Sequence, residues 1–150
     1  MDENIRRKIV ALLDGRRVMT VATLRPDGWP QATTVTYVND GLALYFLCDP
    51  NGQKARNLAH DDRVSLTIDD DPSDVMAITG VSMAAHARPV EDLVVVAKVL
   101  DALRARYRDY KGPPIPMPKP EEIRVFRVTP MVISVLDYSK GFGHTDLVWC

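Results

Sequence analysis

Cysteine and histidine are scarce in this chain, and the shortage argues against two kinds of site. The 150 residues include two cysteines, Cys48 and Cys150, which form neither a CxxC pair nor a disulfide framework. The three histidines, His60, His86 and His144, have no His or Cys partner at the spacing of metal ligands. We therefore expect no metal site and no disulfide scaffold.

Long apolar runs and an excess of charge are also lacking. No uninterrupted apolar run approaches the ~20 residues that a membrane-spanning helix needs, and the charged N-terminus has no apolar core of a signal peptide. The formal net charge is -1, which gives no reason to expect nucleic acid or an anionic membrane as a partner. The default expectation is a cytoplasmic protein. The motifs GxSxG, HExxH and the phosphate-binding GxxxxGK[ST] are absent, so these hydrolytic and nucleotide-binding chemistries are not indicated.

What is present fits a single folded domain over residues 1–150. Hydrophobic residues make up 46% of the chain, enough for a packed core. Helical periodicity predicts helices over 3–14, 53–60 and 90–107, the last with an apolar stripe of Leu93, Val96, Leu100, Leu103 and Tyr107. Five prolines make the segment 111–120 an extended loop.

Short β-branched runs predict the strands. They are expected at 18–24, 31–38, 42–48, 63–69, 75–88 and 123–136, with a hairpin turn at 39–41 and a bend or bulge at Gly80. The first three would form a meander. Hairpin-linked strands with isolated helices favour an α+β protein, mainly β, built on an antiparallel barrel rather than a parallel sheet.

The segment 49–58, DPNGQKARNL, is the most informative for function. It combines a strand end, a turn, a helix start and two basic residues. A helix N-terminus offers free N–H groups and the positive end of a dipole, and Lys54 adds a point charge, an arrangement that suits a phosphate. The alternative is a capped surface helix whose Lys54 and Arg56 are merely solvated.

The stretches VMTVATLRPDGWPQATTVTYV and GLALYFLCDPNGQKARNLAHDDRVSLTID, with SVLDYSKGFGHTDLV near the end, resemble the pyridoxamine 5'-phosphate oxidase-like family of FMN-binding split barrels. The resemblance implies a homodimer with the flavin between subunits and a small-molecule substrate. It implies backbone and hydroxyl contacts to the isoalloxazine ring, Leu47 and Cys48 along the ribityl chain, and Gln53 and Lys54 on the phosphate. The ring contacts would come from Thr33, Thr34, Val35 and Thr36.

Further candidates are weaker. Asn57 and Arg56 would stand near the phosphate. The glycine-containing tail, with Lys140, Phe142 and His144, would reach the partner's flavin, the alternative being a frayed terminus. Thr33 and Thr36 fall on opposite faces of a strand, so some of these threonines are expected to be only structural.

The chain departs from the oxidase for which the family is named. The strand carries Gln31-Ala32-Thr33-Thr34 without an arginine, and the C-terminus lacks an Arg-Leu-His segment. We therefore expect a flavin-dependent oxidoreductase that acts on another substrate. Two alternatives stay open: a deazaflavin-dependent reductase, and a flavin- or haem-binding module without turnover.

Overall fold

The computed structural model describes residues 1–150, which form three α-helices, eight strands and three short 3-10 turns. The helices are α1 (Glu3–Asp14), α2 (Gln53–His60) and α3 (Leu93–Arg106). The strands are β1 (Val18–Leu24), β2 (Pro30–Thr36), β3 (Val38–Asp40), β4 (Ala43–Cys48), β5 (Arg63–Asp69), β6 (Thr79–Pro89), β7 (Arg124–Asp137) and β8 (Thr145–Trp149). No helix is long and apolar enough to cross a membrane.

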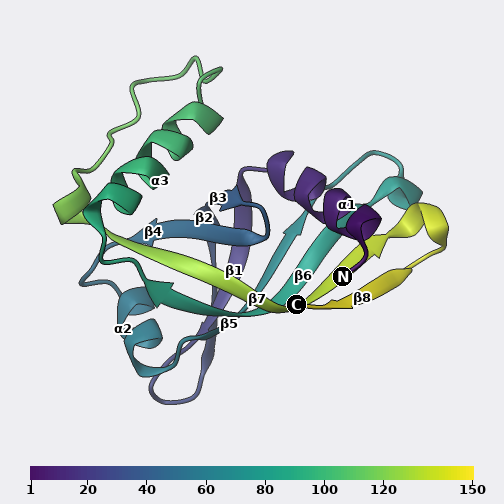
Figure 1. Cartoon of the computed structure of the whole chain (residues 1–150), viewed down its shortest axis with the longest axis horizontal. Coiled ribbons are helices and arrows are strands. Elements are labelled where there is room, and N and C mark those ends of the chain that lie inside the picture. The colour runs from purple at the N-terminus through teal and green to yellow at the C-terminus, as the bar shows by residue number, and fades with distance from the viewer.

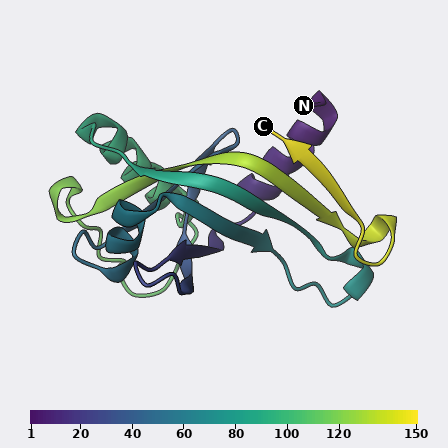
Figure 2. The ribbon, with the colours of Figure 1, turned by 90° about the horizontal axis from the view of Figure 1, so that it is seen from below.

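All strands belong to one antiparallel sheet in the order β2-β1-β5-β6-β7-β4-β3, and β8 pairs with the far end of β7. The sheet curls so that β2 and β4 approach each other without backbone pairing, which leaves the barrel split along that line (Figure 1). The long strands β6 and β7 continue beyond the curled part, where β8 folds back along β7 (Figure 2). The fold is therefore an α+β split barrel, as expected.

Strand alternation builds the core inside the curl. In β5, Val64, Leu66 and Ile68 are buried while the residues between them are exposed. Phe46 and Phe126 stack there with ring centroids 5.5 Å apart. Helix α1 packs Ile9 and Leu13 onto this cluster, and α3 forms a second cluster over the outer side of β4 and β7 with Val96, Val99, Leu100 and Leu103.

The expected meander is wrong. Val38 does not continue the second strand but opens β3, which pairs with β4 through a turn at Gly41, where φ is +58°. Consequently β2 has β1 as its only sheet neighbour. Of the three residues predicted to form the turn, 39–41, the first two belong to β3 and only Gly41 is in the turn.

Other boundaries also shift for local reasons. Val75–Ala77 is a 3-10 turn capped by Asp74, so β6 begins at Thr79. Asp92 caps α3, whose first residue Leu93 is exposed rather than part of the buried stripe. The residues after 144 form strand β8, which periodicity had not indicated.

Gly80 is required by a close approach, because a Cβ there would lie 2.7 Å from the Ile68 carbonyl oxygen. The register irregularity, however, falls where Ala84 and Ala85 of β6 pair with Val132 and Pro130 of β7, so the extra residue is Met131 of β7. Proline has no N–H to donate to a ladder, which explains why the irregularity sits there and not at Gly80.

Candidate functional site

The start of α2 is built by the turn after β4. The Asp49 side chain accepts the Asn51 N–H at 2.8 Å, and the Asp49 carbonyl accepts the Gly52 N–H at 3.0 Å. Gly52 is the N-cap and has no side chain to bond the N–H groups of the first helical turn. These groups therefore point out of the helix as free donors, next to the end of β4 (Figure 1).

Lys54 lies in this first turn and is half-buried. Burial lowers the pKa of its ammonium below the usual range for lysine. Its Nζ has no carboxylate within 4.0 Å, unlike Lys8 and Lys140, which are both paired. The neighbouring Cys48 thiol is also half-buried, and burial raises its pKa, so Cys48 is held as a neutral thiol beside Lys54. Lys54 is thus a partly desolvated, unpaired cation that an anion can approach.

Asn57 stands at the centre of a buried polar network. Its side chain is fully buried, donates to Thr23 Oγ1 at 2.9 Å and Gln31 Oε1 at 3.1 Å, and accepts from Gln53 Nε2 at 2.7 Å. Arg56 in turn donates to Gln53 Oε1 at 2.9 Å and to the Asn51 carbonyl. These bonds tie α2 to β1 and β2, so Asn57 acts by holding α2 in position.

The four predicted ring-contacting residues divide between the two faces of β2. Thr33 and Val35 are half-buried, and Val35 packs against the core. Thr34 and Thr36 are exposed on the outer face. The Thr33 hydroxyl oxygen is buried and has no hydrogen-bond partner, whereas the outer hydroxyls are open to a ligand. Of these four residues, only Thr34 and Thr36 can therefore contact a ligand on the outer face through their side chains.

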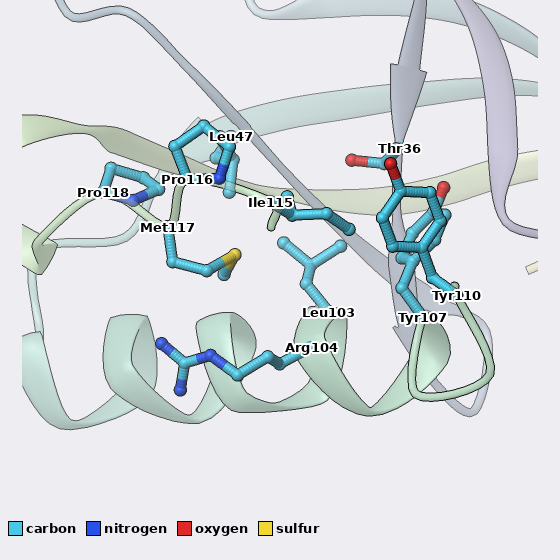
Figure 3. A pocket seen from close by; sticks show the side chains of 10 residues that line it. All are labelled: Thr36, Leu47, Leu103, Arg104, Tyr107, Tyr110, Ile115, Pro116, Met117 and Pro118. Atoms are coloured by element: carbon cyan, nitrogen blue, oxygen red, sulfur yellow. The ribbon is translucent and has the colours of Figure 1, made fainter. Parts of the chain in front are cut away.

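Strand β4 repeats this division at the other side of the split. Cys48 packs against the barrel core, whereas Leu47 packs outward against the α3 cluster. Leu47 and Thr36 together line a cleft of about 510 Å³ (Figure 3). The rest of its wall comes from the end of α3, from the residues that directly follow this helix, and from the proline-rich segment 111–120.

This wall is not predicted by the sequence patterns. Its lining includes Tyr107, Tyr110, Ile115 and Met117, whereas the prolines of the segment 111–120 predict only an extended loop. The available signal was the apolar content of that loop, with Ile115 and Met117 set between prolines.

The tail candidates lie elsewhere in the chain. Lys140 Nζ and His144 Nε2 each lie 3.2 Å from a carboxylate oxygen of Asp146, and Phe142 packs on the Tyr138 ring at 5.1 Å while 78% exposed. This loop follows the far end of β7, whereas α2 lies near its start (Figure 1). One copy of the chain does not bring Lys54 and Phe142 together.

Comparison with known proteins supports a relationship across most of the chain. The family model described as pyridoxamine 5'-phosphate oxidase matches residues 5–137. Among solved structures, a conserved hypothetical protein from Mycobacterium tuberculosis is 28% identical with a TM-score of 0.74, covering 93% of this chain and 87% of its own. A haem-binding protein from Mycobacterium smegmatis is 29% identical, with a TM-score of 0.69 over 96% of this chain and 56% of its own. An F420 reductase is 27% identical, with a TM-score of 0.66 over 83% of this chain and 94% of its own.

Proposed function

Because this chain belongs to the pyridoxamine 5'-phosphate oxidase family, we propose that it is an oxidoreductase that binds FMN along the split between β2 and β4. The observation that carries the proposal is the start of α2, where the helix has uncapped N–H groups and the unpaired Lys54 lies beside Cys48 at the end of β4. A phosphate gains both from the helix dipole and from a nearby cation.

The residues around the split fit the rest of the cofactor. Leu47 and Cys48, at the end of β4, would border the ribityl chain. Thr34 and Thr36 would offer hydroxyls to the isoalloxazine ring, and Thr33 and Val35 would contribute only backbone groups, because their side chains turn inward. FMN itself supplies hydride or electron transfer, so the protein needs no nucleophile of its own.

A homodimer is part of the proposal, and the outer face of the sheet supports it. Two cross-strand rows of uncharged side chains run across this face from β2 to β8. One row is Thr34, Thr20, Thr67, Ser82, Ser134 and Leu147; the other is Ala32, Ala22, Ser65, Ala84, Val132 and Trp149.

None of these twelve residues is charged, although 26% of the chain is, which would place roughly three charges among them. The rows end in Leu147 and Trp149, which are 59% and 71% exposed. Charge depletion with exposed aromatic and aliphatic side chains is typical of the centre of an interface, and a twofold contact is the commonest oligomer. A second copy placed on this face would also border the outer threonines of β2. A cytoplasmic location stays an expectation.

A deazaflavin is the second candidate cofactor, favoured by the 27% identity to an F420 reductase. A haem-binding module without turnover is the third, favoured by the 29% identity to a haem-binding protein. The visible spectrum of the purified protein separates the three. FMN gives a yellow chromophore, a deazaflavin absorbs at shorter wavelength, and haem gives a Soret band.

The phosphate contact is tested by replacing Lys54 with alanine and titrating FMN and riboflavin. A charge-assisted hydrogen bond is worth about 1.5–3 kcal/mol, so FMN affinity should fall roughly ten- to a hundredfold. Riboflavin, which has no phosphate, should be affected far less. The matched control is Lys98→Ala on the exposed side of α3, which should change neither affinity. Equal losses for the two ligands in Lys54→Ala would show that the phosphate lies elsewhere.

A further inference from the structure

The cleft beside the split has walls from four separate parts of the chain, one of which is Leu47 of β4. Leu103 and Tyr107 come from the C-terminal end of α3 and the residue after it, Ile115 and Met117 from the proline-rich segment, and Thr36 from the outer face of β2 (Figure 3). Its volume of about 510 Å³ lies within the usual range for small-molecule sites.

The lining of the cleft carries a single charged side chain. Its one charged residue, Arg104, is paired with Asp101 at 3.2 Å, and its side chain extends along α3 away from Tyr107 and Tyr110 (Figure 3). An anionic group placed between the tyrosines and Met117 would lose its hydration with the Arg104 guanidinium directed away from it, which is costly. The aliphatic and aromatic walls instead favour an apolar ligand, and tyrosine rings favour stacking against another ring.

Polar atoms gather at one end of the cleft. The hydroxyls of Thr36, Tyr107 and Tyr110 all lie at that end, while the opposite end is formed by Met117 and the prolines (Figure 3). A ligand with one hydrogen-bonding group on an otherwise apolar ring system would match this division.

The walls are also held in place before any ligand arrives. Proline fixes its own φ, so the segment with Pro116 and Pro118 loses little conformational freedom on binding. Gly112 lies directly under the Tyr110 side chain, because a Cβ on Gly112 would be 2.2 Å from the Tyr110 hydroxyl oxygen. A side chain at Gly112 would push the Tyr110 ring away from its present place in the wall.

We propose that this cleft binds the organic substrate, and that the substrate is an uncharged, largely apolar, ring-containing molecule with one hydrogen-bonding group. This inference rests on the proposed function for its redox role, since Thr36 and Leu47 are shared between the cleft and the groove assigned to the flavin. A phosphorylated substrate fits this cleft poorly, because the one charged side chain of its lining, Arg104, is directed away from the tyrosine end.

The test measures binding of an uncharged naphthalene fluorophore, prodan, to the full-length protein with and without FMN. Ile115 is exposed enough to be changed without disturbing the core, so Ile115→Asp should weaken prodan binding at least tenfold while leaving FMN affinity unchanged. The matched control Val94→Asp makes the same kind of change at an exposed site on α3 and should have no effect. Gly112→Ala should weaken prodan binding severalfold, and naphthalene sulfonate should bind the wild type at least tenfold more weakly than prodan.

Three results would overturn the inference: no saturable prodan binding, equal binding by wild type and Ile115→Asp, or displacement of prodan by FMN. The last would mean that the cleft is the ring pocket of the flavin. Failure of the proposed phosphate site would show separately, as equal losses of FMN and riboflavin in Lys54→Ala with prodan binding intact.

Discussion

Replacing Asn57 with alanine should destabilise the protein because this one side chain holds α2 against two strands. The variant loses two donated hydrogen bonds, to Thr23 and Gln31, and one accepted from Gln53. Gln31 and Gln53 are half-buried and can turn to water. Thr23 is only 2% exposed, so its hydroxyl is left without a partner.

The expected loss in the free energy of unfolding follows from this difference in exposure between Thr23 and the two glutamines. A net hydrogen bond contributes about 1 kcal/mol, and a buried polar group left unsatisfied costs about 1–3 kcal/mol. The bonds to the glutamines are partly replaced by water, so the total loss should be about 2–4 kcal/mol. In a chain of this length, 1 kcal/mol shifts the melting temperature by about 2–4 °C, which gives a decrease of roughly 4–16 °C.

Urea unfolding followed by circular dichroism measures the loss, and a double-mutant cycle with Thr23→Val tests its cause. Removing the Thr23 hydroxyl also removes the unsatisfied group, so the double variant should be more stable than the sum of the two single losses by about 1 kcal/mol or more. Additive losses would refute the network. A normal stability with weakened FMN binding would refute it differently, by showing that Asn57 contacts the ligand and does not merely position α2.

Three other predictions concern separate parts of the molecule. The hydrogen bond and ion pair from Lys8 lower the pKa of Asp137 to about 2, below its value in the unfolded chain. The stabilisation from this pair should therefore be complete above about pH 4 and be lost as the pH falls toward 2. The unfolding free energy of Asp137→Asn should fall less steeply with acid than that of the wild type, and parallel curves would contradict this. Ser82→Arg places a charge in one of the two uncharged rows on the outer face and should yield monomers in sedimentation, whereas Ser73→Arg in an exposed loop should not; a dimeric Ser82→Arg protein would move the interface elsewhere. Phe142→Ala should change the free energy of unfolding by less than about 0.5 kcal/mol, because the side chain is 78% exposed. The same change should weaken FMN binding severalfold if the tail covers the flavin. An unchanged FMN affinity would show that the tail does not contact the cofactor.

Local signals in the sequence predicted the elements that depend on local interactions. The alternation of Val64, Leu66 and Ile68 gave β5 with its correct face, and Gly52 followed by Gln53 gave the start of α2. Strand β8 has no such signal, since its five residues mix charged and apolar side chains and it is stabilised by pairing with β7. The register irregularity had a signal in Pro130, but its effect on the pairing could be seen only in the assembled sheet, where β7 carries one extra residue opposite β6.

The candidate site was predictable to a similar depth. Period-two alternation placed Thr33 and Thr36 on opposite faces, as the structure confirms. Which face turns outward depends on the curl of the whole sheet, which no short segment encodes. The same applies to Asn57, whose partners Thr23 and Gln31 lie 34 and 26 residues away in the chain. Its burial follows from α2 packing on β1, and sequence alone offered only its place beside Lys54.

The tail and the dimer are linked by the length of β7. Arg124 pairs with Cys48 near α2, and Leu136 pairs with Thr145 beside the tail loop. Twelve residues of strand separate these points, which at about 3.3 Å per residue is roughly 40 Å along the strand. FMN is much shorter than this distance, so a single chain cannot place both Lys54 and Phe142 on one cofactor. Contact between the tail and the flavin therefore requires a partner subunit, and Ser82→Arg, if it yields monomers, should abolish any effect of Phe142→Ala on FMN affinity. A persisting effect of Phe142→Ala in a proven monomer would show that the tail acts on flavin binding within its own chain.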